Sequence, residues 1–264
     1  MSRISKAFEK EKAFIAFITG GDPDIETSCE LIKTMAASGA DIIEIGIPFS
    51  DPIAEGPVIQ EASLRALNAG TTTDLLFDMV GELRKEIEIP LIFMTYMNPI
   101  YVYGTERFMK KCTEAGIDGV IVPDVPFEEK AELADQCRAH GVDLISMIAP
   151  TSEERIELIA REAEGFIYCV SSLGVTGVRS EIKTDIGTMI KHVKAVTDVP
   201  CAVGFGISTP EQAEKMAGLS DGAIVGSAIV KLVAKYGKEA APYVADYVRS
   251  MKAGVMKAER YADS

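Results

Sequence analysis

The sequence predicts an α/β fold in which one domain, residues 1–264, forms a (β/α)8 barrel, also called a TIM barrel. Eight short apolar runs alternate with stretches of helical period, which is the pattern of repeated strand–helix units. The runs lack the alternation of strands with one solvated face, as expected for parallel strands covered on both faces. The chain also lacks a linker or a shift in composition, so we expect no second domain.

Turn signals precede most of the apolar runs. Gly39, Gly116 and Gly141 each stand two residues before an aspartate, and a glycine in the left-handed conformation commonly ends a helix. Pro90 and Pro200 precede two further runs. The expected strands are Ala13–Thr19, Ile42–Ile45, Leu91–Tyr96, Gly119–Val122, Leu144–Met147, Phe166–Val170, Cys201–Phe205 and Ala223–Val225.

Amphipathic stretches fill the intervals between these strands. Asp24, Ser152 and Thr209 precede three of them, and such side chains are suited to cap the first turn of a helix. The expected helices are Ile25–Ala37, Glu106–Ala115, Glu128–Arg138, Glu154–Ala163, Ile186–Val196 and Pro210–Ala217, followed by a last helix over Glu239–Ala258.

Two intervals between strand starts are longer than the others. The starts at residues 41 and 91 are 50 residues apart and those at 166 and 201 are 35 apart, whereas the other intervals are 21–28 residues. The surplus after strands 2 and 6 predicts extra helix or loop over the C-terminal face of the barrel, where functional sites of this fold lie.

The composition excludes several classes of partner. A net charge of −13 and a pI near 4.7 disfavour binding to nucleic acid or to an anionic membrane. The five cysteines are scattered and form no C-x-x-C pair, so neither a disulfide framework nor a zinc knuckle is expected. The N-terminus lacks a signal-peptide core and no apolar run is long enough to span a membrane, so we expect a cytoplasmic protein.

Carboxylates mark the region of the second strand. Glu44 lies inside the apolar run Ile42–Ile45, and a rigid loop of prolines and glycines follows, carrying Asp51 and Glu55. A carboxyl in an apolar strand is either paired with a neighbouring strand or shifted toward the neutral form. The first alternative is structural; the second predicts a proton donor or acceptor.

Glycines follow the strands near the end of the chain. Gly204–Ser208 follows strand 7, and Gly226 with Ser227 follows strand 8 and opens a helix. Both motifs let backbone N–H groups approach an anion, which favours a phosphate site over simple tight turns. The stretch Ser171–Arg179 after strand 6 is either a mobile lid or a surface linker.

Missing motifs narrow the chemistry further. No lysine lies in an expected strand, so a Schiff-base mechanism lacks its nucleophile. His140 and His192 fall on or beside helices away from the barrel mouth, and no metal site is expected. The chain has no phosphate-binding loop of the G-x-x-x-x-G-K-[ST] type.

The motifs as a set resemble the tryptophan synthase alpha chain family. The signature is Glu44–Pro52 followed by Gly56–Gln60. The resemblance runs from about residue 1 to 258, and four further blocks occur in the family's order: Phe17–Pro23, Pro123–Pro126, Gly174–Gly177 and Gly204–Ile207.

The resemblance implies cleavage of indole-3-glycerol phosphate to indole and glyceraldehyde 3-phosphate, in the last steps of L-tryptophan biosynthesis, without a cofactor in this chain. Glu44 matches the catalytic glutamate, which protonates the indole ring carbon and then takes the proton of the glycerol hydroxyl. Glu55 stands where the family usually has the aspartate that holds the indole N–H.

Other positions match the family's binding residues. Tyr168 and Thr176 match residues linked to ordering the acid–base pair and closing the loop after strand 6. The implied indole pocket is Phe17, Tyr96, Ile148, Tyr168 and Thr176, and the implied phosphate binders are Gly177, Phe205, Gly206, Gly226 and Ser227.

The family implies an α2β2 complex with a beta chain that carries pyridoxal phosphate. The implied contact surface is Pro48, Phe49, Asp51 and Asn98 with the apolar loop Pro99–Tyr103. Two alternatives stay open. One is another phosphate-binding barrel isomerase or synthase; the other is a non-catalytic alpha-like subunit that docks on a beta chain and activates it, for which Glu55 is the hint.

Overall fold

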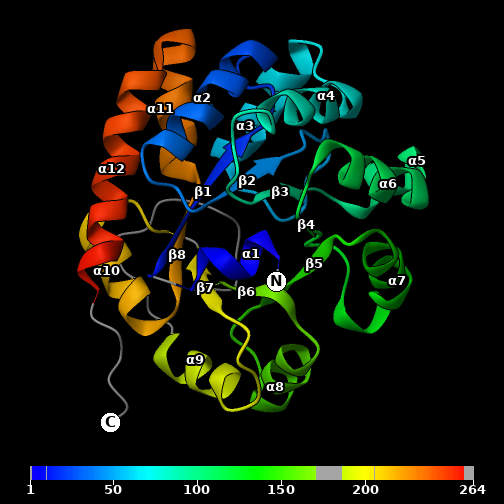
Figure 1. Cartoon of the computed structure of the whole chain (residues 1–264), viewed down its shortest axis with the longest axis vertical. Helices are drawn as coiled ribbons and strands as arrows, with labels where there is room; N and C mark the ends of the chain where they lie inside the picture. The colour runs from blue at the N-terminus through cyan, green and yellow to red at the C-terminus, as the bar shows by residue number, and fades with distance from the viewer. Residues whose placement is uncertain (1, 10, 171–185, 205, 259–264) are drawn as a thin grey trace.

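Eight parallel strands close into a barrel in the order β1 to β8 (Figure 1). The structure, a computed structural model, describes residues 2–9, 11–170, 186–204 and 206–258. The strands are β1 (Ala13–Thr19), β2 (Ile42–Gly46), β3 (Leu91–Met94), β4 (Gly119–Ile121), β5 (Asp143–Ile148), β6 (Glu164–Val170), β7 (Cys201–Gly204) and β8 (Gly222–Val225). Each expected strand is therefore present, which confirms the barrel predicted from the sequence.

The helices surround the ring of strands, apart from α1, which lies near its centre in Figure 1. No helix in the described ranges has both the length and the apolar character that a membrane span requires. The helices are α1 (Arg3–Ala7), α2 (Ile25–Ala37), α3 (Pro57–Asn68), α4 (Thr73–Leu83), α5 (Met97–Tyr103), α6 (Thr105–Ala115), α7 (Ala131–His140), α8 (Glu153–Arg161), α9 (Ile186–Lys194), α10 (Pro210–Leu219), α11 (Ser227–Tyr236) and α12 (Ala241–Lys257), with 3-10 turns at Phe127–Glu129 and Gly237–Glu239.

The predicted helix ends are formed by the expected chemistry. Asp24, Ser152 and Thr209 each accept a hydrogen bond from the backbone N–H three residues on, as N-caps do. Gly116 and Gly141 end α6 and α7 in the left-handed conformation. The local signals that divide the chain into units therefore act in the folded protein as well.

The surplus chain after strand 2 folds into two helices, α3 and α4, as the spacing allowed. A further difference follows β3. The expected strand Leu91–Tyr96 ends at Met94, and Tyr96 instead caps the short helix α5, whose range covers the predicted loop Pro99–Tyr103. The surplus after strand 6 lies within residues 171–185, outside the described residues.

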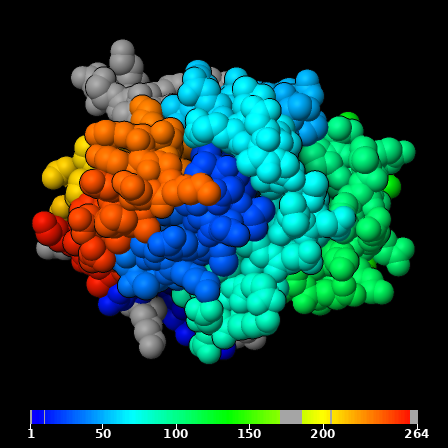
Figure 2. Space-filling model, turned by 90° about the horizontal axis from the view of Figure 1, so that it is seen from above, coloured from blue at the N-terminus to red at the C-terminus, as the bar shows by residue number. Residues whose placement is uncertain are grey.

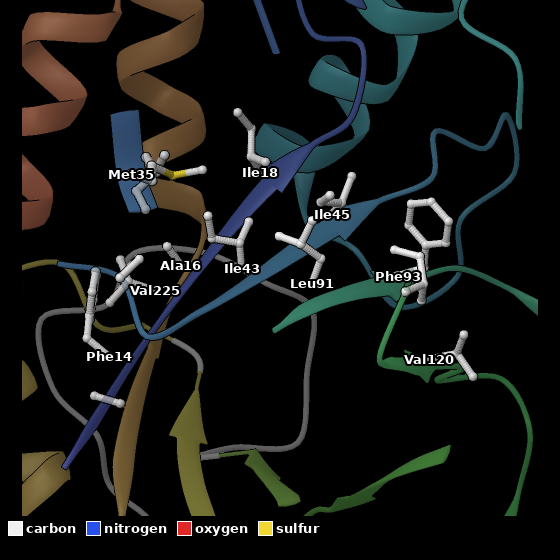
Figure 3. Packing of buried hydrophobic residues seen from close by; sticks show 14 of the residues in the cluster. Phe14, Ala16, Ile18, Met35, Ile43, Ile45, Leu91, Phe93, Val120 and Val225 are labelled. Carbon is white, nitrogen blue, oxygen red and sulfur yellow. The ribbon is translucent and has the colours of Figure 1, made fainter. Parts of the chain in front are cut away.

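Two apolar layers hold the barrel together. Ile15 and Ile42 belong to the inner layer, among residues that come almost entirely from strands. Phe14 and Ile43, their neighbours in the chain, belong to the outer layer between strands and helices, together with Met35 of α2 (Figure 3). Alternate residues of one strand thus serve different layers, and both faces of the sheet are buried.

The ring closes where the two ends of the chain meet. β1 pairs with β8, and the late helices α11 and α12 contact α3 and α2. Figure 2 shows these orange and red helices side by side with the blue and cyan segments. The short helix α1 also packs against the inner layer. Ile4 of α1 is fully buried in this layer, and Phe8 lies 5.8 Å from Phe166, ring centre to ring centre.

Candidate active site

Glu44 lies in the middle of β2 and points into the barrel. It is 1% exposed, and Phe17 of β1 and Ile92 of β3 are its neighbours across the sheet. Its Oε1 atom is buried and has no hydrogen-bond partner among the described residues. Burial raises the pKa of this carboxyl to about 8, because nothing nearby compensates the charged form. The structural alternative of an interstrand ion pair is therefore not what the described residues form.

Glu55 lies in the loop between β2 and α3, directly before the helix N-cap Gly56. Gln60 donates a hydrogen bond to its carbonyl oxygen at 2.8 Å, which ties the loop to the first turn of α3. Burial raises the pKa of the Glu55 carboxyl to about 7, against a hydrogen bond from Tyr96 that lowers it. Its Oε2 atom is buried without a partner in the described part of the chain. One carboxyl with a raised pKa therefore lies on β2 and a second lies in the loop that follows it.

Tyr96 connects this loop to the end of β3. Its phenolic oxygen accepts a hydrogen bond from the backbone N–H of Ala54 at 3.1 Å and donates one to the Glu55 carboxylate. Its ring lies 5.5 Å from the ring of Phe49. The tyrosine is 3% exposed, so a buried side chain fixes both the backbone and the carboxyl of the loop.

Aromatic side chains form walls around Glu44. Phe17 packs with Ile59 and Ala62 of α3 and with Val230 of α11. On the opposite side, Tyr168 belongs to the inner layer of the barrel. Both are 6% exposed and were predicted to line the pocket.

The charge state of Glu44 also affects the pKa of Tyr168. Burial raises the pKa of its phenol, and the negative charge of an ionised Glu44 raises it further. Gly204 leaves the space for this phenol, since a Cβ there would come within 2.5 Å of the Tyr168 hydroxyl oxygen. The sequence linked Gly204 to a phosphate motif; its closest packing is against Tyr168.

The prediction for Ile148 is wrong. Ile148 is fully buried in the outer layer, between the strands and the helices, and does not face the barrel interior. Met147 and Ala149 pack against the inner layer instead. A shift in the β5–β6 register between Ile145 and Ser146 accompanies this assignment, and only the pleat of the folded strand decides which neighbour points inward.

The expected phosphate end lies beside β8. Gly206 has a positive φ of 76°, and Gly226 is the N-cap of the ten-residue helix α11, which begins at Ser227. Gly226 supplies no side-chain cap, so backbone N–H groups and the positive end of the helix dipole are offered to an anion. A Cβ on Gly226 would contact Phe17 at 3.3 Å, which relates this end to the wall of the pocket. The other predicted contacts, Thr176, Gly177 and Phe205, lie outside the described residues.

A cavity of about 610 Å³ adjoins the loop that carries Glu55. Its lining includes Ile53 and Ala54 of this loop, Met147 and Ala149 of the β5 end, and Val170. Met147 and Ala149 were not predicted to line the site, although they stand one residue either side of the predicted Ile148. Inward-facing residues at the end of β5 and residues of the β2–α3 loop therefore line the same cavity.

The predicted contact surface is partly exposed. Pro48 is buried and Phe49 half-buried, whereas Asp51 and Asn98 are exposed. The apolar stretch is helix α5 rather than a loop, and it still leaves large side chains in solvent. The most exposed are Tyr101 at 74% and Val102 at 77%, with Ile53 at 74% in the β2–α3 loop. Exposed apolar side chains of this size, on α5 and on the β2–α3 loop, mark a candidate protein-binding surface.

A closed (β/α)8 barrel that holds a buried glutamic acid with a raised pKa and a half-buried second carboxyl, each with one oxygen that has no partner among the described residues, is the arrangement of an acid–base enzyme of the barrel class. Residues 4–259 match the family model described as "Tryptophan synthase alpha chain". The chain belongs to the tryptophan synthase alpha chain family.

Similar proteins cover nearly the whole chain. The tryptophan synthase alpha chain of Lacticaseibacillus casei is 46% identical over 255 residues, with 97% of this chain and 96% of that protein covered. That of Thermoanaerobacter sp. (strain X514) is 48% identical over 259 residues, covering 96% and 99%. Among solved structures, Mycobacterium tuberculosis tryptophan synthase is similar with a TM-score of 0.87, 32% identity and coverage of 97% and 98%. The structure of the Legionella pneumophila tryptophan synthase alpha chain is similar with a TM-score of 0.86 and 37% identity, and the match covers 97% of each chain.

Proposed function

We propose that this protein is a carbon–carbon lyase that cleaves indole-3-glycerol phosphate to indole and glyceraldehyde 3-phosphate, as the alpha subunit of a tryptophan synthase. The observation that carries the proposal is Glu44, a buried carboxyl inside the barrel with a pKa raised to about 8 and no described partner for Oε1. Such a group is protonated at neutral pH, and an acid in an apolar site is what protonation of a ring carbon requires.

The first step is proton transfer from Glu44 to the ring carbon that bears the glycerol chain. The ring becomes an iminium cation and Glu44 becomes a carboxylate. Glu55 accepts the hydrogen bond of the indole N–H, whose acidity increases as the positive charge develops. This role needs the carboxylate form of Glu55, which the hydrogen bond from Tyr96 favours.

The second step returns the proton to the enzyme. The Glu44 carboxylate removes the proton of the hydroxyl on the chain carbon next to the ring. That carbon becomes the aldehyde as the carbon–carbon bond breaks, and the bonding pair restores the neutral indole. One proton leaves Glu44 and one comes back, so the site finishes as it began and consumes no cofactor.

Binding uses the remaining walls. Phe17 and Tyr168 give the indole ring apolar surfaces, with Tyr96 beside the loop of Glu55. The phosphate binds at the N-terminus of α11 through Gly226 and Ser227, together with Gly206. Thr176, Gly177 and Phe205 belong to the same proposal by their match to the family's motifs.

A beta chain is the proposed partner, in an α2β2 assembly in the cytoplasm. Indole is small and apolar, and direct transfer to a partner whose pyridoxal phosphate condenses it with serine prevents its loss. The exposed apolar side chains of α5 and the exposed Asp51 and Asn98 support a contact surface on this side of the barrel mouth.

The test is indole release from indole-3-glycerol phosphate by the purified protein, with and without a beta chain. Indole formed in either condition supports the proposal. If no indole forms in either condition while the chain still stimulates the beta reaction, the protein is a non-catalytic docking subunit, the alternative that Glu55 suggests. If neither effect occurs, another barrel chemistry on a phosphate ester replaces the proposal.

A further inference from the structure

We propose a surface site for a divalent transition-metal ion of the zinc class, formed by Glu153 and Glu157 of α8 and His192 of α9. The site lies among the outer helices and is independent of the proposed lyase chemistry. No metal site was predicted here, because His192 falls on a helix away from the barrel mouth and stands 35 positions after Glu157 in the chain. The fold brings them together, since α8 and α9 contact each other.

The geometry is that of a three-ligand set. One donor atom from each residue lies within 4.8 Å of the other two. Nδ1 of His192 is 3.1 Å from Oε1 of Glu153. Two ligands about 2.0–2.1 Å from a tetrahedral ion lie roughly 3.3 Å apart, so this pair already has the spacing of two zinc ligands.

Helical periodicity supplies the third ligand. Glu153 and Glu157 are four residues apart on α8 and therefore lie on the same face of the helix, toward α9. A carboxylate oxygen of Glu157 already lies within 4.8 Å of the donor atoms of Glu153 and His192. Solvent reaches the group, with side-chain exposures of 64% for Glu153 and 25% for His192, so water completes the coordination.

The charges suit a dication, with one competitor. Two carboxylates and a neutral imidazole carry a charge of −2, and this mixture of imidazole and carboxylate favours zinc, cobalt or copper over calcium or magnesium. Arg161 occupies Oε2 of Glu157 at 3.0 Å and opposes the ion. Binding replaces the His192–Glu153 contact by two metal–ligand bonds and requires the imidazole to be unprotonated.

A bound ion would join the helix before β6 to the helix after it. α8 precedes this strand and α9 is the next described helix that follows it. Because β6 carries Tyr168, the ion links two outer helices across the strand that forms one wall of the pocket. The expected physical effect is a rise in the melting temperature when the ion is added.

The experiment is calorimetric titration of the full chain with zinc chloride near pH 7.5. All variants carry Cys29→Ser, because Cys29 is the one cysteine that is not buried. We expect one equivalent of zinc to bind and the melting temperature to rise. Affinity should fall by at least about tenfold in His192→Ala and in Glu157→Gln, the smallest loss typical when a group supporting a metal site is removed.

The chain offers a matched control in its other histidine. His140 is the last residue of α7, where its Nδ1 lies 2.9 Å from the Gln136 carbonyl oxygen, and His140→Ala should bind zinc like its parent. Because the chain has two histidines, ¹⁵N NMR also identifies the ligand directly. The imidazole signal whose chemical shift changes when zinc is added should be the one that is missing in His192→Ala. Unchanged affinity in His192→Ala, or no zinc uptake by the parent at millimolar concentration, would overturn the proposal.

Discussion

Phe17 lies directly opposite Glu44 in the register of the β1–β2 pair, so an aromatic ring faces the only ionisable side chain of β2. Both side chains are buried, and the neighbour of Glu44 on β3 is Ile92, which belongs to the inner apolar layer. The sheet itself therefore supplies the apolar environment that raises the pKa of Glu44. No long-range charge is needed to hold this acid in its neutral form.

Glu44→Gln should abolish most indole release while the fold survives. The amide keeps the size of the side chain but can neither donate the proton to the ring carbon nor remove it from the hydroxyl. General acid–base catalysis contributes about 10²–10⁴-fold, so the rate of indole formation should fall by that factor. Indole assay and circular dichroism measure the two outcomes; a well-folded variant with near-normal turnover contradicts the assignment.

The same substitution should make the protein more stable at alkaline pH. In the unfolded chain Glu44 ionises near 4.5, whereas in the folded chain it stays neutral up to about 8. Between these values the unfolded state has released a proton that the folded state retains, so the contribution of Glu44 to stability falls as the pH rises.

Denaturant unfolding of both proteins from pH 4 to 9 tests this prediction. The advantage of Glu44→Gln should grow through this window by an amount on the order of 5 kcal/mol, since the pKa differs by about 3.5 units and one unit corresponds to about 1.4 kcal/mol. Glu55 is present in both proteins and its effect cancels in the difference. A difference that does not depend on pH would mean that Glu44 ionises in the folded protein as it does in water.

Glu55→Asp should retain indole release or increase it. The shorter side chain restores the length that the family motif usually has, and the hydrogen bond from Tyr96 is the described contact of this carboxylate that has to adjust to it. We expect kcat/KM no lower than about a third of the parent value, compared with a far larger loss for Glu55→Gln. A loss near 10²-fold in Glu55→Asp, typical of a misplacement of about 1 Å, would show that the site is built around the longer side chain.

Tyr96→Phe should shift the acid side of the activity profile to higher pH. The reaction needs Glu55 ionised and Glu44 protonated, so kcat/KM should fall below about pH 7 and above about pH 8. Loss of the phenol removes the hydrogen bond that lowers the pKa of Glu55. The acid limb then moves upward, with a loss at the optimum of less than about tenfold, as for one hydrogen bond.

The exposed Tyr243 on α12 provides the control for that experiment. It stacks on Tyr236 far along the chain from the carboxyls, and Tyr243→Phe should leave the profile unchanged. An unshifted acid limb in Tyr96→Phe would mean that another group sets the lower pKa of the profile.

Local signals predicted the parts of the fold that depend on local chemistry. Asp24 and Thr209 cap the helices that they were expected to cap, and Ala13–Thr19 is a strand with the predicted bounds. Glu44 could be recognised from the sequence because a carboxylate in an apolar run is costly. These features need only a few neighbouring residues to explain them.

Features that depend on distant contacts were not predictable. The orientation of Ile148 depends on the strand pleat and on an irregular register with β6. Tyr96 leaves its strand early to bond Ala54, which lies 42 residues away. The helix α1 is too short to show a periodic pattern, and its formation depends on burying Ile4 among strands that come later in the chain.

That short helix also determines how solvent meets the carboxyls. Ile4 and Phe8 pack against the inner layer, with Phe8 on Phe166 near the amino end of β6, so α1 covers apolar side chains at the amino ends of the strands. Water, substrate and product would then all enter and leave the barrel interior at the carboxyl ends of the strands. A ligand whose phosphate is bound at that end of the barrel would itself exclude water from Glu44. Binding of the ligand and exclusion of water then become a single event.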